Sequence, residues 1–473
     1  RLCPIRGRRR CDASTIAENA PVRPPEIRVP APGPNSAPVL DLARRLESPA
    51  TASFGQSPNP IVIERGDGAV VEDADGNRFL DFVAGFGVLN LGHGHPKQIG
   101  AMQAQMAKVV HVMGAVNPTR TALMEALAEV TPGAGPKRIL FATGGGEAID
   151  MALRLVRNAT GGYEALAFYG AYHGRGQGAL SLMGRGSGRK GLEPMLAGAV
   201  HAPYPYCYRC PFGETYPECG LACARFVENL VKGASTGVAQ PAAIFIEPVQ
   251  GNGGMIPAPV EFLVAMRRLC DETGVLLVAD EVMSGWGRTG RFFAIEHAGV
   301  EPDLLVMGKA MGGGIPLAAV VSKAAINEGQ TPNRDSSTLA GNPVASAAAL
   351  ATIEVLRQDG LIAHAAAVGA YFLDGLKALA GEFEIIGDVR GSGLMLGFEV
   401  VKDRASKEPI SGATRRLNAL CLAEGLLPYP AGGHHGNVLG FLPPLIVTRS
   451  DVDAALGILR RVLGRYMAEV TPA

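Results

Sequence analysis

Two short apolar stretches decide the fold: GVLLVAD at residues 274–280 and DLLVMGK at residues 303–309. Each is a compact run of apolar residues, of the kind that a strand buried in a parallel sheet shows. The first run ends on Asp280 and the second ends on Lys309. Because ligands bind beyond the carboxyl ends of the strands in an open α/β sheet, these two residues mark a candidate site.

Runs of the same kind lie on either side of this pair. They are RILFAT (138–143), EALAFYG (164–170), AAIFIEP (242–248) and LAAVVS (317–322). Longer helical patterns separate them, as in proteins whose helices cover both faces of a mostly parallel sheet. The sequence therefore predicts an α/β fold, with a large domain over residues 96–350.

The two ends of the chain are predicted to form a smaller α/β domain. Residues 37–95 contain a hairpin pattern, in which Asp75, Gly76 and Asn77 separate two runs with alternating apolar residues. Residues 351–473 contain the strand pattern GSGLMLGFEVV and a final helical pattern. Residues 1–36 are basic at first and then rich in proline, so we expect them to be disordered.

The overall charge excludes several classes of partner. The chain has 44 Lys and Arg residues against 44 Asp and Glu residues, which is not the balance of a nucleic-acid binder or a polybasic membrane binder. It has no stretch of about 20 uninterrupted apolar residues, and its basic start lacks the apolar core of a secretory signal. We therefore expect a cytoplasmic protein with small-molecule partners, and neither nucleic acid nor a membrane.

Lys309 and Asp280 have complementary chemistry. Alone, either residue would usually be a solvated loop residue. A buried lysine, however, has a lowered pKa, so its neutral amine can attack an aldehyde and form an imine. An aspartate that faces a pyridine nitrogen keeps that nitrogen protonated, and the ring can then withdraw electrons from a substrate carbanion. Pyridoxal phosphate (PLP) has both an aldehyde and a pyridine ring, so the pair predicts a PLP site.

A glycine-rich turn offers a place for the phosphate of this cofactor. Thr143, Gly144, Gly145, Gly146 and Glu147 follow the strand pattern RILFA and precede a helical pattern. Unpaired backbone N–H groups and the positive end of the helix dipole would meet at this turn. Many strand-to-helix turns look the same, so its position in the order of elements is the stronger argument.

Seven motifs in order carry a family resemblance. They are NLGHGHP (90–96), YHGR (172–175), IEPVQGNGG (246–254), ADEVMSGWGRTG (279–290), PDLLVMGKAMGGGIPLAAVV (302–321), STLAGNPVASAAAL (337–350) and VRGSGLMLG (389–397). Over about residues 58–470 the chain resembles the class III aminotransferases, the fold-type-I family of the 4-aminobutyrate, ornithine and taurine–pyruvate enzymes. The resemblance implies a PLP-dependent enzyme that moves an amino group from an amine or amino acid to a 2-oxo acid. It also implies a homodimer or a dimer of dimers.

The resemblance assigns cofactor-binding roles to particular residues. The matching residues are Lys309 for the imine, Asp280 for the pyridine nitrogen, Val282 and Tyr172 for the two ring faces, Gly145 and Gly146 for the phosphate, and Thr338 for the phosphate of the neighbouring subunit. Each site would therefore be shared across a dimer.

Three positions depart from the family pattern. The family usually has Ser or Thr at position 146 and Gln at position 283, whereas this chain has Gly146 and Met283, so two polar contacts near the cofactor are lost. Gly440 stands where the family has an arginine that binds the α-carboxylate of the substrate. The pocket would therefore lack one of the two carboxylate-binding cations.

Other matches concern the substrate. Arg175 matches the arginine that holds the distal carboxylate of 4-aminobutyrate, and Glu247 matches a glutamate that pairs with the missing arginine. Phe86 lies where a pocket-wall side chain is expected. These matches favour an ω-amino acid as the amino donor. The departure at Gly440 leaves open a PLP-dependent racemase or epimerase, and a dialkylglycine-type decarboxylase is a further alternative.

A cysteine cluster lies within a loop-like insertion at residues 204–225. Its members, Cys207, Cys210, Cys219 and Cys223, have the spacing C-x2-C-x8-C-x3-C. Four thiolates that lie close together can bind a structural zinc ion in a tetrahedral site. Reduced thiols and disulfides are the alternatives, and disulfides are disfavoured in the cytosol.

Overall fold

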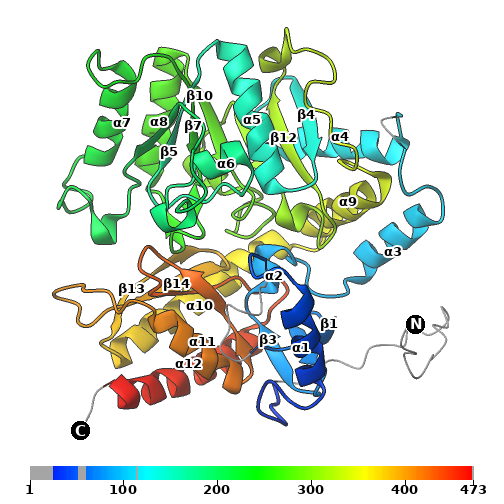
Figure 1. The fold of residues 1–473 in the computed structure, drawn as a ribbon, viewed down its shortest axis with the longest axis vertical. Coiled ribbons are helices and arrows are strands. Elements are labelled where there is room, and N and C mark those ends of the chain that lie inside the picture. The colour runs from blue at the N-terminus through cyan, green and yellow to red at the C-terminus, as the bar shows by residue number, and fades with distance from the viewer. Residues whose placement is uncertain (1–24, 52–59, 113–114, 471–473) are drawn as a thin grey trace.

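The computed structural model describes residues 25–51, 60–112 and 115–470. The middle of the chain builds a large domain, at the top of Figure 1, and both ends of the chain build a small domain below it. The expected α/β fold class with these two parts is confirmed. Over the residues described, the chain has no helix that is long and apolar enough to cross a membrane.

A seven-stranded sheet forms the centre of the large domain. In spatial order its strands are β4 (Lys137–Ala142), β12 (Ala318–Lys323), β11 (Leu304–Met307), β10 (Leu276–Asp280), β7 (Pro241–Ile246), β5 (Glu164–Phe168) and β6 (Ala199–Ala202). β12 runs antiparallel to both of its neighbours, and the other adjacent pairs are parallel. The six apolar runs of the sequence are all strands of this sheet, whereas β6 has no comparable apolar run.

Both faces of the sheet are covered, and each face has its own hydrophobic core. In β7, Phe245 lies in the core that contains helix α5 (Gly145–Thr160), whereas Ile246 lies in the core that contains helix α8 (Val260–Thr273). A strand buried on both faces is apolar at nearly every position. This is why compact apolar runs marked these strands in the sequence.

Shorter elements complete the large domain. Its other helices are α3 (Pro96–Met106), α4 (Pro118–Val130), α6 (Gln177–Ser181), α7 (Ala222–Lys232) and α9 (Pro343–Gln358), and a two-stranded sheet joins β8 (Val249–Gln250) to β9 (Ile256–Pro257). The one-turn helix α2 (Ala84–Gly87) leads from the small domain towards α3.

The two ends of the chain meet in the small domain. Its first sheet has the order β1 (Ile63–Asp67), β2 (Val70–Asp73), β3 (Arg78–Asp81) and β15 (Leu426–Leu427), and its second has the order β13 (Ile386–Ser392), β14 (Met395–Val400), β17 (Val438–Phe441) and β16 (Tyr429–Gly432). The helices are α1 (Ser36–Leu46), α10 (Leu361–Glu382), α11 (Ala413–Ala423) and α12 (Arg449–Val470). The expected hairpin is present as β2 and β3, and β15 adds a parallel strand to it from the other end of the chain.

Residues 25–36 depart from the disorder expected for residues 1–36, of which 1–24 lie outside the described residues. The backbones of Glu26 and Arg78 exchange hydrogen bonds, and the side-chain oxygen of Asn77 accepts one from the backbone N–H of Arg28 at 2.7 Å. A proline-rich segment can still pair its remaining N–H groups with the edge of a sheet. Composition alone therefore misjudged this segment.

Candidate active site

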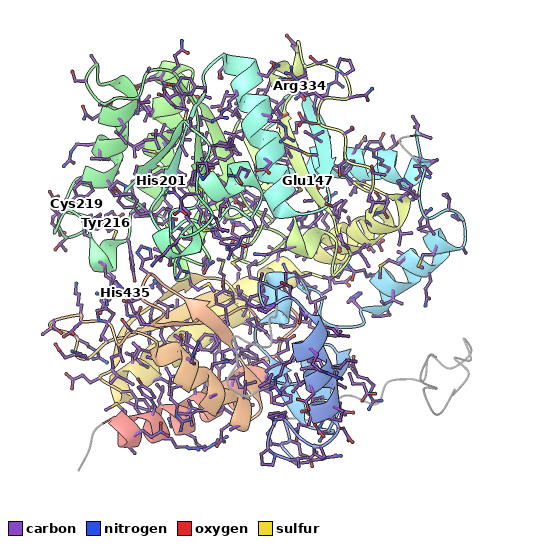
Figure 2. The ribbon with its side chains drawn as sticks, in the orientation of Figure 1. Glu147, His201, Tyr216, Cys219, Arg334 and His435 are labelled. Atoms are coloured by element: carbon purple, nitrogen blue, oxygen red, sulfur yellow. The ribbon has the colours of Figure 1, made fainter. Side chains whose placement is uncertain are left out.

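The predicted site residues gather at one edge of the large sheet. Strands β4, β5, β7, β10 and β11 point the same way, so the loops that follow them lie together. They form a pocket of about 930 Å³ whose lining includes Phe86, Gly145, Gly146, Tyr172, Arg175, Glu247, Asp280, Val282, Met283 and Lys309. The small domain closes the pocket from below. Figure 2 shows His435, a residue of the small domain that lines the pocket, at the border of the two domains.

Lys309 follows β11 and is held in an unusual backbone conformation. Its φ angle is +46°, in the left-handed region that residues with a side chain rarely adopt. Strain of this kind persists where the surrounding structure fixes the residue. Burial lowers the pKa of the Lys309 amine, although the nearby carboxylates of Asp280 and Glu247 act in the opposite direction. The environment therefore shifts the amine towards its neutral, nucleophilic form.

Asp280 ends β10, the strand beside β11, and its carboxylate has two partners. One oxygen, Oδ2, lies 2.7 Å from Nδ1 of His173, and the other accepts a hydrogen bond from the backbone N–H of Val282 at 3.0 Å. Burial lowers the pKa of His173, but the hydrogen bond and the charge of Asp280 outweigh burial and raise it. A charged His173 would form an ion pair with Asp280. The sequence reasoning missed His173, although it stands in the YHGR motif.

Glu247 follows β7 and connects two loops of the pocket. Its Oε1 accepts a hydrogen bond from the backbone N–H of Tyr172 at 2.9 Å, and its Oε2 accepts one from Gly251 at 3.1 Å. Burial raises the pKa of Glu247 to about 7. This carboxyl group therefore fixes the position of Tyr172, the residue expected to cover one face of the cofactor.

The turn after β4 forms a cradle without side chains. A Cβ atom on Gly145 would lie 2.9 Å from Cγ1 of Val282, and one on Gly146 would lie 3.2 Å from the backbone nitrogen of Arg175. The first N–H groups of α5 have no acceptor within the helix, and they carry the positive end of its dipole. Glu147, labelled in Figure 2, accepts hydrogen bonds from the backbone and the hydroxyl of Thr143 and so braces the turn. This cradle suits an anionic group.

These groups together fit PLP. The amine of Lys309 matches the aldehyde, the buried carboxylate of Asp280 matches the pyridine nitrogen, and the cradle at Gly145 and Gly146 matches the phosphate. The pocket is also large enough for a cofactor and a small substrate together, since ligand pockets usually span about 300–1,000 Å³.

The structure explains what occupies the space beside Gly440. A Cβ atom on Gly440 would lie 2.7 Å from Cε of Met255 and 3.2 Å from Cδ1 of Tyr429. The buried ring of Tyr429 packs edge-on against Phe86, with 5.5 Å between the ring centres. Met255 and an aromatic wall of Tyr429 and Phe86 therefore occupy the space where the resemblance predicts a cation.

Thr338 does not line the pocket that contains Lys309. It is exposed, on the loop before α9, and it lines a second cavity of about 360 Å³ together with Ser337, His111 and Arg120. Within one chain, the structure therefore does not bring Thr338 to the cofactor cradle.

The expected zinc site is not supported. The four cysteines of the insertion are free thiols around a small cavity of about 20 Å³. Among the residues that the structure describes, no three or more His, Cys, Asp or Glu side chains are grouped closely enough to hold a metal ion. Burial raises the pKa of the Cys223 thiol to about 11. Figure 2 shows Cys219 at the outer edge of the large domain.

Ion pairs, rather than a metal ion, attach the insertion to the small domain. Arg209 is the last residue of a short 3-10 helix, Cys207–Arg209, and it forms an ion pair with Glu399 of β14. Glu399 also accepts a hydrogen bond from the Tyr206 hydroxyl. Arg390 of β13 pairs with the same carboxylate at 3.0 Å. This cluster links the large domain to the small domain beside the pocket.

Comparison with known proteins identifies the family of the chain. The family model of class-III aminotransferases matches residues 51–463. The chain is 38% identical over 423 residues to the 5-aminovalerate aminotransferase of Pseudomonas putida, a match that covers 88% of this chain and 96% of that protein. It is 37% identical over 408 residues to the leucine/methionine racemase of Thermococcus litoralis, covering 85% of this chain and 90% of that protein. Its structure is similar to that of an amine transaminase from an uncultivated Pseudomonas species in its PLP-bound form, with a TM-score of 0.81, 31% identity, and coverage of 89% and 98% of the two chains.

Proposed function

The chain belongs to the class-III aminotransferase family, and from that premise we propose that it transfers the amino group of an ω-amino acid to a 2-oxo acid. The observation that carries the proposal is that Lys309 and Asp280 line one pocket, at the ends of two adjacent strands. The relative from Pseudomonas putida, which is named for 5-aminovalerate, supports an ω-amino acid as the donor.

The reacting groups have distinct roles in this proposal. When bound, PLP would supply an aldehyde for the amine and a ring that withdraws electrons from the carbon bearing it. Nζ of Lys309 would hold the aldehyde carbon at rest and, once released, take the proton from that substrate carbon. Asp280 would keep the proton on the pyridine nitrogen, and His173 would keep the Asp280 carboxylate oriented.

The remaining residues would position the cofactor. Tyr172 and Val282 would enclose the ring, and the N–H groups at Gly145 and Gly146 would bind the phosphate. Glu247 would act on the ring indirectly, through the backbone of Tyr172. Phe86, Met283 and Arg175 would line the substrate side.

A substrate screen tests the proposal. The purified, PLP-loaded enzyme is incubated with a panel of ω-amino acids, α-amino acids and uncharged amines, with pyruvate or 2-oxoglutarate as acceptor. We expect the highest kcat/KM for donors whose carboxylate lies far from the amine. A preference for simple α-amino acids would contradict the choice of donor, and no transfer from any amine would contradict the activity.

Racemisation is a second candidate function, favoured by the racemase relative and by the absence of a cation at Gly440. In a racemase the proton returns to the carbon that lost it, and no 2-oxo acid is needed. Incubation with L-leucine or L-alanine without acceptor, followed by chiral chromatography, separates the two reactions. The racemase would be favoured if the D-isomer forms without acceptor faster than the amino group is transferred in the presence of acceptor.

The proposal includes a homodimer with shared sites. Thr338 is exposed and lies outside the pocket of its own chain, so a contact with a cofactor phosphate would have to be made in a neighbouring subunit. Thr338 of each subunit would then contact the phosphate bound in the other. Mixing inactive Lys309→Ala with impaired Thr338→Ala should restore activity, because a mixed dimer contains one intact site. A fully active monomer would contradict this arrangement.

A further inference from the structure

Arg185 lies in the substrate pocket without a carboxylate partner. It follows α6, it is half-buried, and it lines the same cavity as Lys309. Among the described residues, no Asp or Glu side chain lies within 4.0 Å of its guanidinium group, whereas the half-buried Arg209 and Arg267 are each paired with a carboxylate. A guanidinium is always charged at physiological pH, so this charge faces the pocket uncompensated.

The guanidinium group is held in place by neutral acceptors. Its Nη1 donates to the side-chain oxygen of Asn252 at 2.8 Å and to the backbone oxygen of Asn252 at 3.4 Å. The same backbone oxygen accepts a hydrogen bond from Gly433 of the small domain at 3.2 Å. One corner of the guanidinium is therefore anchored at the junction of the two domains.

The other edge of the guanidinium is free to bind a ligand. In the described part of the chain, Nε and Nη2 of Arg185 have no hydrogen-bond partner, and neither nitrogen is sealed from solvent. Two N–H groups on one edge of a guanidinium match the two oxygens of a carboxylate. The acids of the pocket do not use this edge, because Asp280 is engaged by His173 and Glu247 by the backbone of Tyr172 and Gly251.

We propose that Arg185, oriented by Asn252, binds the carboxylate of the amino-acid substrate. This inference rests on the proposed function and names the residue that recognises the negative charge. Tyr429, close enough to Arg185 to experience its charge, continues the wall towards Phe86. An ω-amino acid would place its amine at Lys309, its methylene chain along the aromatic wall and its carboxylate at Arg185.

The other arginines of the pocket are less suited to this role. Arg175 and Arg415 are both exposed. Arg175 leans over the ring of Tyr172 at 5.9 Å, and its only hydrogen bond in the described structure reaches the Gly188 oxygen at 3.4 Å. Ion pairs in contact with bulk water contribute little, whereas a partly desolvated, pre-oriented pair contributes more. Arg185 is the partly desolvated, pre-oriented cation of the three.

The first experiment compares two donors of the same chain length, one ending in a carboxylate and the other in a methyl group. The rate of the donor half-reaction is measured by absorbance in the PLP-loaded enzyme, without acceptor, for 5-aminovalerate and for pentylamine. Arg185→Gln should lower the second-order rate constant for 5-aminovalerate about 10- to 100-fold, the factor for a lost hydrogen-bonded charge contact, and leave pentylamine within a factor of about two. Arg185→Lys should retain part of the preference for 5-aminovalerate, since it keeps the positive charge but loses the two parallel N–H donors of the guanidinium. Arg415→Gln is the matched control and should keep the wild-type ratio.

The second experiment measures binding without chemistry. Calorimetry with pentanoate and with uncharged pentanamide should show that Arg185→Gln weakens pentanoate binding selectively. Equal losses for both donors, or an unchanged preference for 5-aminovalerate, would overturn the inference, as would a selective loss in Arg175→Gln instead. If the wild type reacts with neither amine, the proposed function fails, and pentanoate binding still decides the role of Arg185.

Discussion

Nδ1 of His173 lies 2.7 Å from Oδ2 of Asp280, and both side chains are almost entirely shut off from solvent. The two residues come from different strand ends, His173 after β5 and Asp280 at the end of β10. Hydrogen bonds to buried groups cost more to lose than exposed ones, because the remaining partner is left unsatisfied. This pair therefore sets the orientation of the carboxylate that faces the pyridine nitrogen.

His173→Phe should lower kcat by about 10- to 100-fold, because it removes a charged hydrogen bond worth roughly 1.5–3 kcal/mol and leaves Asp280 without it. His173→Asn places an amide N–H close to the position of Nδ1 and should recover much of the rate. The measurement is kcat for both variants, together with the absorbance of the bound cofactor as a function of pH. Equal rates in the two variants would show that His173 only fills space.

Asp280→Ala should still bind some cofactor, because the cradle at Gly145 and Gly146 is intact. Its turnover should fall by orders of magnitude, since an unprotonated ring withdraws electrons poorly. Cofactor content, measured by absorbance, and kcat, measured with saturating substrates, separate binding from rate. Turnover at the wild-type rate would remove Asp280 from its proposed role.

Glu281 should make the protein less stable as the pH rises. Its side chain is fully buried, it accepts hydrogen bonds from Ser284 and from the backbone N–H of Ile295, and burial raises its pKa to about 7. A carboxyl group whose pKa is higher in the folded state stabilises fully below its unfolded value, near 4.5. That contribution is lost as the pH rises through about 7.

Glu281→Gln should remove this dependence while keeping the shape of the side chain. We expect the Tm of the wild type to fall between pH 5 and pH 8 and that of the variant to fall less. The free energy of unfolding should fall by on the order of 3 kcal/mol more in the wild type than in the variant by pH 8. Thermal denaturation at several pH values checks the prediction. Parallel pH profiles for the two proteins would contradict it.

Glu399 should be essential for attachment of the cysteine-containing insertion. Its side chain is fully buried and pairs with both Arg209 and Arg390. Removing one partner of a buried ion pair typically costs about 3–5 kcal/mol, so Glu399→Ala should lower the free energy of unfolding by that amount. Glu408→Ala, which removes an exposed pair with Lys402, is the control and should cost less than about 1 kcal/mol. Denaturant unfolding compares them, and similar losses would contradict the role of Glu399.

The sequence predicted best the features that depend on local pattern. Strands β10 and β11 were recognisable because a strand buried on both faces is apolar throughout, and Asp280 and Lys309 were recognisable because each ends such a run. The turn at Gly145 was recognisable because it lies between a strand pattern and a helix pattern.

Features that depend on contacts between distant segments were harder to predict. His173 meets Asp280 across 107 positions of sequence, and Arg185 meets Asn252 across 67. Neither pairing has a local periodicity. The wall of Tyr429 beside Gly440 depends likewise on the pairing of β16 with β17, and the segment from Glu26 to Val29 depends on the turn around Asn77, between β2 and β3.

The covalent attachment of the cofactor to Lys309 is the central claim, and one measurement tests it directly. The PLP-loaded enzyme is reduced with borohydride, digested with a protease and analysed by mass spectrometry, with Lys309→Ala treated in parallel. We predict that the mass of the reduced cofactor appears on the peptide that contains Lys309, and that the variant carries no such mass and has no turnover. Reduced cofactor on another lysine, or undiminished turnover in Lys309→Ala, would contradict the account.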